Sequence, residues 1–244
     1  MNISERQNEI IKYVSENEYM SVNELAKLTF TSPSSIRRDL CALENLGMVK
    51  RSHGGVSRPE ITGNVASFYR RSMKNTKEKR AIAKKAAELL SDGQSIMLDS
   101  SSTASFLLPY IAKLDSVTVF TNNLETAINS IKQGIPTHCI GGHNINGSVS
   151  LGGATAYKTL SGINVDILFF SSQSLNREGI ISDSTETENY IRQLMLACAR
   201  KKVFLCDSTK FDTVSLHKLS NIDDIDIAIF DKSYDELVTK TKIM

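Results

Sequence analysis

The chain has 244 residues, of which 41% are hydrophobic and 23% are charged, with a formal net charge of +2 at pH 7. A chain of this length usually forms two domains, and its hydrophobic content is enough for a substantial core. No apolar run approaches the length of a membrane span, the start MNISERQNE is too polar for a signal peptide, and the four cysteines lack zinc-site or disulfide spacing. We therefore expect a reduced cytoplasmic protein without a membrane span, a metal site or a cofactor.

Two short helices are expected at the start of the chain. An apolar stripe predicts a first helix over residues 4–16. In SVNELAKLT, Ser21 precedes Glu24 by three residues, a capping box that predicts the start of a second helix. The apolar positions of the two helices are Ile3, Ile10, Ile11 and Val14, and Val22, Leu25, Ala26 and Leu28.

A third helix and a basic hairpin follow in SPSSIRRDLCALENLGMVKRSHGGV. Ser32 and Pro33 are typical of a helix start, Gly47 ends the helix, and its apolar stripe is Ile36, Leu40, Leu43 and Leu46. Three helices and a hairpin in this order predict a winged helix-turn-helix that binds double-stranded DNA. The expected contacts are Ser32, Ser34, Ser35, Arg37 and Arg38 on the helix, and Lys50, Arg51 and His53 in the wing. The alternative is a three-helix packing module whose arginines do not bind DNA.

The same segment resembles the signature of the DeoR family of bacterial transcriptional regulators. In that family an RRDL core is followed by a leucine-glutamate pair and an R-x-H-G-G wing, and here the segment reads IRRDLCALENLGMVKRSHGGV. The resemblance continues in order through most of the chain. It implies a regulator, most simply a repressor of a sugar or carbohydrate operon.

Charge and composition divide the chain. Residues 1–60 carry 8 basic and 8 acidic side chains, residues 70–85 carry 8 basic and one acidic, and the last 159 residues carry 13 basic and 18 acidic. The basic segment fits either a contact with flanking phosphates or a solvated helix face. Gly54, Gly55, Pro59 and Gly63 mark a hinge. We predict a DNA-binding domain over 1–57, a linker over 58–75, and a domain for effector sensing and oligomerisation over 76–244.

The second domain alternates helices and strands. Strands are expected in QSIMLD, SVTVFT, IPTHCIGG, VDILFF, KVFLCD and IDIAIFD, with helices between them and a short helix at the end. Cys139 and Cys206 lie in apolar runs and are expected to be core thiols. The alternation predicts an α/β fold with a mostly parallel sheet covered by helices on both faces.

Polar residues follow several of these strands and predict a ligand site at the carboxyl edge of the sheet. The DSSST loop can bind an anion through hydroxyls and helix-start N–H groups, and Lys210 can reach a phosphate. Asp183 and Glu188 can hold sugar hydroxyls. The candidate residues are Asp99, Ser100, Ser101, Ser102, Thr103, Thr121, Asn122, Gly141, Gly142, Gly152, Asp183, Glu188, Asp207 and Lys210. Taken singly, such residues often only cap helices, form turns or are solvated.

The family resemblance implies that this domain has the phosphosugar isomerase fold and senses a phosphorylated sugar or a related metabolite. The effector-binding motifs of the family fall on residues 99–103, 121–122, 141–142 and 207–211. Ser101, Ser171 and Ser174 stand where the family usually has glycine. Serine restricts backbone angles and close approach to a ligand, so either the pocket has changed or these turns need no glycine.

Two other functions compete with metabolite sensing. The chain could answer to a protein partner through an altered pocket, or it could be an isomerase with acid–base chemistry at Asp99, Asp183, Glu188 or Asp207. A complete DNA-binding module and the lack of a clear catalytic setting for any of the four histidines count against an enzyme and against catalytic residues. Because one winged helix offers a small footprint, we also predict a homo-oligomer, a dimer or a tetramer.

Overall fold

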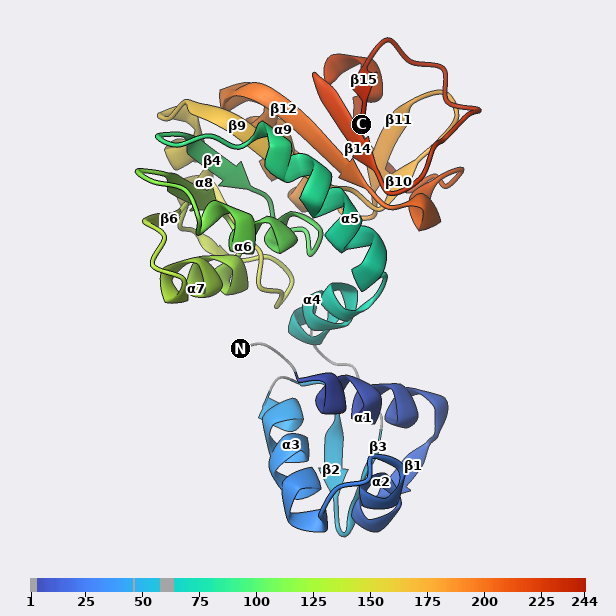
Figure 1. Cartoon of the computed structure of the whole chain (residues 1–244). Coiled ribbons are helices and arrows are strands. Elements are labelled where there is room, and N and C mark those ends of the chain that lie inside the picture. The colour runs from blue at the N-terminus through green and yellow to red at the C-terminus, as the bar shows by residue number, and fades with distance from the viewer. Residues whose placement is uncertain (1–3, 46, 58–63) are drawn as a thin grey trace. The chain divides into compact units, whose positions relative to one another are not determined.

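The computed structural model describes residues 4–45, 47–57 and 64–244 (Figure 1). Of the positions singled out in the sequence, Ile3, Leu46, Pro59 and Gly63 lie outside these ranges. The chain forms two compact units, Met1–Lys74 with Asn146–Ser148, and Asn75–Ile145 with Val149–Met244.

The first unit is a winged helix. Its elements are α1 (Glu5–Glu16), β1 (Tyr19–Ser21), α2 (Val22–Leu28), α3 (Pro33–Asn45), β2 (Lys50–Ser52), β3 (Gly55–Ser57) and α4 (Asn64–Met73). Both α1 and α2 begin with a capping box, the first at Ser4 and the second at the predicted Ser21. The sequence did not indicate β1, which joins the wing in a sheet of order β1-β3-β2.

The core of this unit contains the predicted stripes of the three helices. Ile10, Leu25, Ile36 and Leu43 are fully buried in one cluster. Leu28 was expected in the apolar face of α2 but is 44% exposed. It is the last residue of a seven-residue helix whose buried residues are Val22, Leu25 and Ala26.

The second unit has a seven-stranded parallel sheet of order β15-β14-β12-β9-β4-β5-β6. Its strands are β4 (Ser95–Leu98), β5 (Thr118–Thr121), β6 (Thr137–Cys139), β9 (Val165–Phe170), β12 (Ala199–Cys206), β14 (Ile227–Phe230) and β15 (Lys242–Ile243). Its α-helices are α5 (Thr76–Ala86), α6 (Leu108–Ile111), α7 (Leu124–Lys132), α8 (Ala154–Ser161) and α9 (Glu186–Cys198). The predicted α/β class is confirmed.

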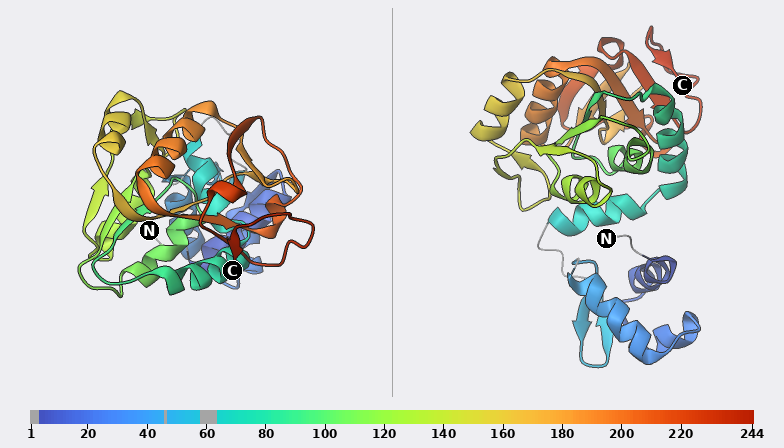
Figure 2. Two further views of the ribbon diagram at one scale, coloured as in Figure 1. Left: turned by 90° about the horizontal axis from the view of Figure 1, so that it is seen from above. Right: turned by 60° about the vertical axis from the view of Figure 1, so that its left-hand side comes forward.

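Alternate residues of the central strands pack on opposite faces of the sheet. Ile167 and Phe169 of β9 join one cluster with residues of α5 and α6, and Leu168 and Phe170 join another with residues of α8 and α9. Helices therefore cover both faces, as the views in Figure 2 show. The described helices include none long and apolar enough to cross a membrane.

Smaller elements were not anticipated. The antiparallel strands are β7 (His143–Asn144), β8 (Leu151–Gly152), β10 (Ser174–Leu175), β11 (Ile180–Asp183) and β13 (His217–Asn221). The first two pair with each other, and the others form a sheet of order β10-β11-β13. Short 3-10 helices are η1 (Ala87–Leu89), η2 (Ala104–Leu107), η3 (Ser208–Lys210) and η4 (Ile222–Asp224).

Two expectations for this unit are wrong. The segment after β14 contains the strand β15 in place of a short helix, because Thr241 donates a hydrogen bond to the carbonyl of Ile222 at 2.6 Å and Lys242 pairs with Ile227. Cys139 is exposed, because it lies on β6 at the edge of the sheet, whereas Cys206 is buried as expected.

Candidate DNA interface and candidate effector site

The amino-terminal half of α3 presents the predicted polar residues to solvent. Arg37 and Arg38 are exposed, whereas Ile36 and Leu40 of the same helix are buried. Ser32 accepts a hydrogen bond from the backbone N–H of Ser35 at 3.3 Å, which caps the helix. Its hydroxyl also shares hydrogen bonds with the hydroxyls of Ser34 and Ser35, at 2.9 and 3.0 Å.

The inner side of α3 carries a buried acid, Asp39, that no sequence pattern indicated. Asp39 accepts hydrogen bonds from Arg6 Nε at 2.5 Å and from Gln7 Nε2 at 3.3 Å. The hydrogen bond and the charge of Asp39 raise the pKa of Arg6. Asp39 therefore fixes α3 against α1, which sets the direction in which the two neighbouring arginines point.

The two glycine positions of the wing favour glycine for two different structural reasons. Gly54 has φ +78°, the left-handed region that favours glycine. Gly55 is packed so tightly that a Cβ atom would lie 2.3 Å from Tyr19 Oη and 2.4 Å from the Met20 carbonyl oxygen. Glycine is therefore favoured at Gly54 by the turn and required at Gly55 by the pairing of β3 with β1.

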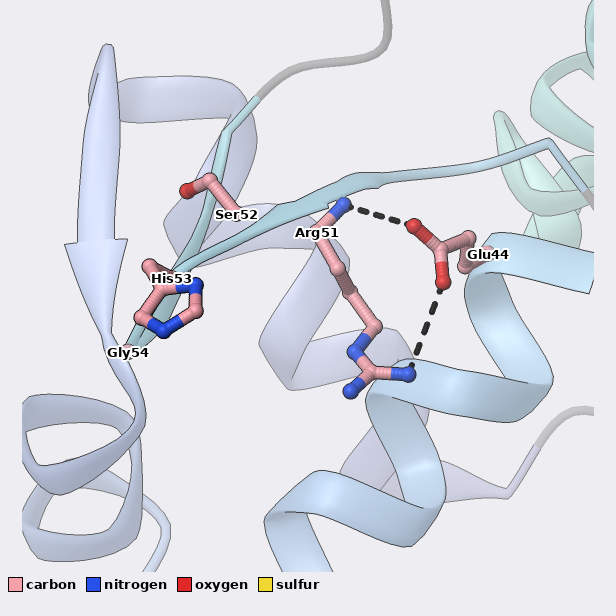
Figure 3. Close-up of a pocket in the computed structure, with 5 residues that line it drawn as sticks. All are labelled: Glu44, Arg51, Ser52, His53 and Gly54. Atoms are coloured by element: carbon pink, nitrogen blue, oxygen red, sulfur yellow. Dashed lines mark hydrogen bonds and ion pairs between the residues drawn. The ribbon is translucent and has the colours of Figure 1, made fainter.

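Lys50, Arg51 and His53 are all exposed on this wing. Glu44 at the end of α3 accepts a hydrogen bond from the Arg51 backbone N–H at 2.9 Å and faces its guanidinium at 3.5 Å (Figure 3). These residues, with Ser52 and Gly54, line an open hollow of about 550 Å³ between the helix and the wing. Glu44 thus ties the wing to α3.

In the second unit, Arg192 of α9 brings together three of the predicted acids. Its Nε lies 2.9 Å from Asp99 Oδ2, its Nη1 2.9 Å from Asp183 Oδ2, and its Nη2 3.7 Å from Glu188 Oε2. The Arg192 side chain is only 6% exposed. Burial acts to lower the pKa of Arg192, but Asp183, Asp99 and Glu188 raise it above its usual value.

A second charged group surrounds the end of β12. Lys210 Nζ lies 3.4 Å from Asp207 Oδ2 and donates a hydrogen bond to Ser171 Oγ at 2.9 Å. Asn75 donates to Asp207 Oδ1 at 3.1 Å. Burial opposes ionisation of Asp207, but the charge of Lys210, the hydrogen bond from Thr209 and the charge of Lys79 together hold the pKa of Asp207 below its usual value.

The two charged groups adjoin each other. The backbone N–H of Ser171, just after β9, donates to Asp99 Oδ2 at 3.3 Å. Because β4, β9 and β12 are neighbours in the sheet, Asp99, Ser171 and Asp207 follow three adjacent strand ends. The structure therefore places Asp99, Asp183, Glu188, Asp207 and Lys210 at one edge of the sheet.

Lys79 of α5 is a further cation at this edge. It is 4% exposed and donates a hydrogen bond from Nζ to Ser102 Oγ at 3.1 Å. Neither Lys79 nor Arg192 was singled out in the sequence. Helical spacing could have found both, because Lys79 shares the buried face of α5 with Ile82 and Ala86, and Arg192 shares that of α9 with Met195.

The loop from Asp99 to Thr103 is folded onto its own polar groups. Asp99 Oδ1 accepts from the N–H of Ser101 at 3.0 Å, and Ser101 Oγ accepts from the N–H of Ala104 at 3.1 Å. The segment after the loop begins as the 3-10 helix η2 and continues as α6. Ser100, Ser102 and Thr103 are buried.

The end of β5 lies beside this loop. Asn123 donates from Nδ2 to the Ser100 carbonyl at 3.2 Å, and Thr121 Oγ1 accepts from the Asn123 N–H at 3.1 Å. Asn122 donates to the Leu151 carbonyl at 3.2 Å. Its other side-chain atom, Oδ1, is buried and has no hydrogen-bond partner among the residues that the structure describes.

The predicted glycines lie where two backbones cross. Gly141 and Gly142 have φ +78° and +101°, and a Cβ atom on Gly142 would lie 2.1 Å from the Gly152 carbonyl oxygen. A Cβ atom on Gly152 would lie 2.8 Å from Ile145 Cδ1. The close backbone of β8 thus requires glycine at Gly142 and the positive φ favours it at Gly141, whereas a side chain at Gly152 would displace the end of Ile145.

The three serines that replace family glycines do not strain the backbone. None of Ser101, Ser171 and Ser174 is among the described residues with positive φ. Their hydroxyls form hydrogen bonds, since Ser171 donates to the Leu205 carbonyl at 2.6 Å and Ser174 pairs with Ser215 at 2.6 Å. These turns therefore need no glycine angle, and the serines add polar groups to the sheet edge.

A separate hollow of about 570 Å³ lies between α9 and β13. Tyr157, Tyr190 and His217 are among its lining residues, and none of the predicted effector residues lines it.

The sequence matches two family models along its length. The DeoR-like helix-turn-helix domain covers residues 6–62, and the DeoR C terminal sensor domain covers residues 74–232. This chain belongs to the DeoR family. The Asp39 contact, the HGG wing and the strand-edge cluster are thus features of a DeoR-type chain with a DNA-binding domain and a sensor domain.

Curated DeoR-type relatives match the chain over nearly its whole length. The HTH-type transcriptional regulator GolR of Listeria innocua is 33% identical over 97% of this chain and 93% of its own. The L-fucose operon activator of Haemophilus influenzae is 31% identical over 95% and 93%. The HTH-type transcriptional repressor GlcR of Bacillus subtilis is 26% identical over 91% and 86%.

Solved structures match part of the chain. Ribose 5-phosphate isomerase from Plasmodium falciparum is 18% identical, with a TM-score of 0.40 over 55% of this chain and 52% of that chain.

Proposed function

We propose that this DeoR-family regulator binds an operator as a homo-oligomer, represses a sugar or carbohydrate operon, and changes its operator affinity when a phosphorylated sugar or related metabolite binds the sensor domain. The observation that carries the proposal is that one chain contains two separate polar regions. The first is the exposed cationic side of α3 and the wing, and the second is the cluster of buried charged side chains at the edge of the sheet.

Operator contact is assigned to residues on two elements of the first unit. The exposed Arg37 and Arg38 would meet base edges or phosphates, and Ser32, Ser34 and Ser35 would donate to phosphates from the same end of α3. Lys50, Arg51 and His53 would meet the backbone through the wing. Because the relatives include both a repressor and an activator, similarity alone does not give the direction of regulation. Repression is therefore proposed and not taken from the relatives.

The charges of the sheet edge favour a ligand that has an anionic group at one end and hydroxyl groups at the other. Lys79 and Lys210, each bonded to a serine hydroxyl, provide positive charge for a phosphate. Asp183 and Glu188 beside Arg192 provide acceptors for sugar hydroxyls. The buried Oδ1 of Asn122 adds an acceptor without a partner in the described part of the chain, and a ligand hydroxyl would relieve its cost of about 1–3 kcal/mol.

One observation favours the alternative of an altered pocket that answers to a different ligand or to a protein partner. The N–H groups of Ser101 and Ala104 are already bonded to side chains of their own loop. A phosphate at this loop would have to displace Ser101 or be held by the lysines alone.

Calorimetric titration of the full chain with aldose and ketose phosphates, and with the same sugars lacking phosphate, tests the proposal. Binding should be limited to the phosphorylated members and should shift operator affinity by about 1–3 kcal/mol. Lys210→Ala should abolish the response and leave operator binding intact, whereas the exposed Lys158→Ala on α8 should change neither.

The same titration separates the alternatives. If Ser101 restricts the loop, Ser101→Gly should tighten binding of the phosphorylated sugar. If neither the wild type nor Ser101→Gly binds any member of the panel, the metabolite proposal is wrong and the partner-responsive alternative replaces it. Conversion of an aldose phosphate to a ketose phosphate would instead identify an isomerase-like enzyme.

A further inference from the structure

The helix α7 presents apolar side chains to solvent and small or polar ones to the sheet. Leu124, Ile128 and Ile131 are 41%, 44% and 62% exposed. At this spacing they form one stripe along the helix. The buried residues of α7 are Thr126, Ala127 and Ser130. An ordinary surface helix has the opposite arrangement, so the outward stripe of α7 has the character of a covered surface.

Polar contacts fix this orientation. Asn123 Oδ1 accepts from the N–H of Thr126 at 3.0 Å, which caps the helix. Thr137 on β6 donates to Ser130 Oγ at 2.8 Å from the inner side of α7. Turning the apolar stripe inward would bury three larger side chains in the place of small ones and break the contact between Thr137 and Ser130. The stripe is therefore held outward by the fold.

The charges of α7 indicate what covers the stripe. Glu125 lies in the first turn and Lys132 in the last, and helical geometry places both on the same flank of the stripe. Leu124 and Glu125 precede Ile128 by four and three residues, and Ile131 and Lys132 follow it by three and four. The apolar pair is thus centred between Ala127 and Ile128 and the charged pair between Ile128 and Asn129, so both centres lie within one residue of Ile128.

From this arrangement we infer that a second copy of the chain packs on α7, with the two α7 helices antiparallel about a two-fold axis near Ile128. In an antiparallel pair the same flank of each helix faces the other. Glu125 of each copy then lies opposite Lys132 of the other, and the apolar stripes cover each other. Such a self-complementary surface is what a two-fold interface requires. The inference names a surface for the homo-oligomer included in the proposed function.

Charge reversal in the full chain tests the pairing. Glu125→Lys and Lys132→Glu each place like charges opposite each other twice in a dimer, and should weaken association roughly tenfold in sedimentation equilibrium. The double variant Glu125→Lys/Lys132→Glu restores opposite charges at both places and should return association to the wild-type range.

The double variant also separates pairing from helix stability. Glu125 and Lys132 each interact favourably with the dipole of their own helix, and the double variant reverses both interactions. Recovery of association by the double variant therefore cannot come from a more stable helix. Circular dichroism of each variant should show that the fold is retained.

Ile128→Asp should weaken association further than either charge reversal, because it places two carboxylates at the two-fold axis. Val238→Asp, at a position 83% exposed outside α7, should have no effect. A monomeric wild type at tens of micromolar would overturn both the oligomer and this surface. A wild-type oligomer unaffected by Ile128→Asp and by the single reversals would overturn the α7 surface alone, and weakening without recovery in the double variant would overturn the antiparallel pairing.

Discussion

The candidate DNA interface and the candidate effector site differ in how their residues are assembled. The DNA-facing residues lie within 22 positions of sequence, from Ser32 to His53, and nearly all are exposed. The effector residues come from segments as far apart as Asp99 and Lys210, and most are buried in hydrogen bonds and ion pairs. An exposed residue of the DNA interface can be substituted without affecting the others. Substitution of one residue in the buried network removes hydrogen bonds or ion pairs from its neighbours.

The largest effect on stability is expected when Arg192, the cation at the centre of the buried network, is removed. Arg192→Ala would leave Asp99 and Asp183 buried without their cation, and should lower the free energy of unfolding by about 3–5 kcal/mol. Urea denaturation of the full chain, followed by circular dichroism, measures the loss.

Arg177→Ala is the matched control. Its side chain is 59% exposed and pairs with Asp212 at 2.6 Å, so its removal should cost only about 0–1 kcal/mol. If the two variants lost equal free energy of unfolding, burial of Arg192 would not be the reason for the contribution of its ion pairs to stability.

The exposed surface should respond in binding and not in stability. Replacing Arg37 or Arg38 with Ala should weaken operator binding by about 1–3 kcal/mol and leave the urea midpoint unchanged. If the arginine contacts a base, sequence preference should also relax, and if it contacts a phosphate, the dependence on salt should decrease. Near-wild-type affinity of the double variant in a gel-shift titration would contradict the assignment of α3.

The stability of the buried edge should also depend on pH. Because the folded protein lowers the pKa of Asp207, its carboxylate stabilises the fold above the ordinary value of 3.8. This contribution is lost as the pH falls through the lowered folded pKa. The difference in unfolding free energy between the wild type and Asp207→Asn should therefore shrink below that pH. A difference that stays constant from pH 6 to pH 2.5 would contradict the ion pair with Lys210.

The smallest effect is expected where the DNA surface has an ion pair of its own. Glu44→Gln keeps an acceptor for the Arg51 N–H but removes the charge that faces the guanidinium. Since the pair is about 40% exposed on both sides, stability should change by less than about 1 kcal/mol. Anisotropy titrations should show slightly tighter operator binding, with a steeper dependence on salt. A tenfold loss of affinity would show that Glu44 sets the wing position through its charge.

The winged helix was predictable because its signals are local. The capping box at Ser21, the Ser32–Pro33 start and the glycines of the wing each depend on neighbours a few residues away. The parallel sheet was predictable for a similar reason, since each buried strand is a short apolar run between helical patterns. Strand β15 was missed because it has only two residues, Lys242 and Ile243, which are too few to show a periodicity.

The composition of the effector edge was predictable only in part. The strand-end residues Asp99, Thr121 and Asp207 follow apolar runs and could be found by position. Helical spacing places Lys79 and Arg192 on the buried faces of their helices, but the charge of each side chain by itself suggests solvent exposure. Their burial follows from partners on other elements, Ser102 for the first and Asp99 with Asp183 for the second.

The distribution of the cysteines makes the two units separately addressable by chemical labelling. Cys41 is exposed on α3 and Cys139 on β6, so each unit has one accessible thiol. Cys198 and Cys206 are buried, and burial raises the pKa of Cys206 to about 12, which suppresses its reactive thiolate. A fluorophore or spin-label pair could therefore be attached to the native chain. Such a pair would report the distance between α3 and the sensor domain during an effector titration, without any engineered residue.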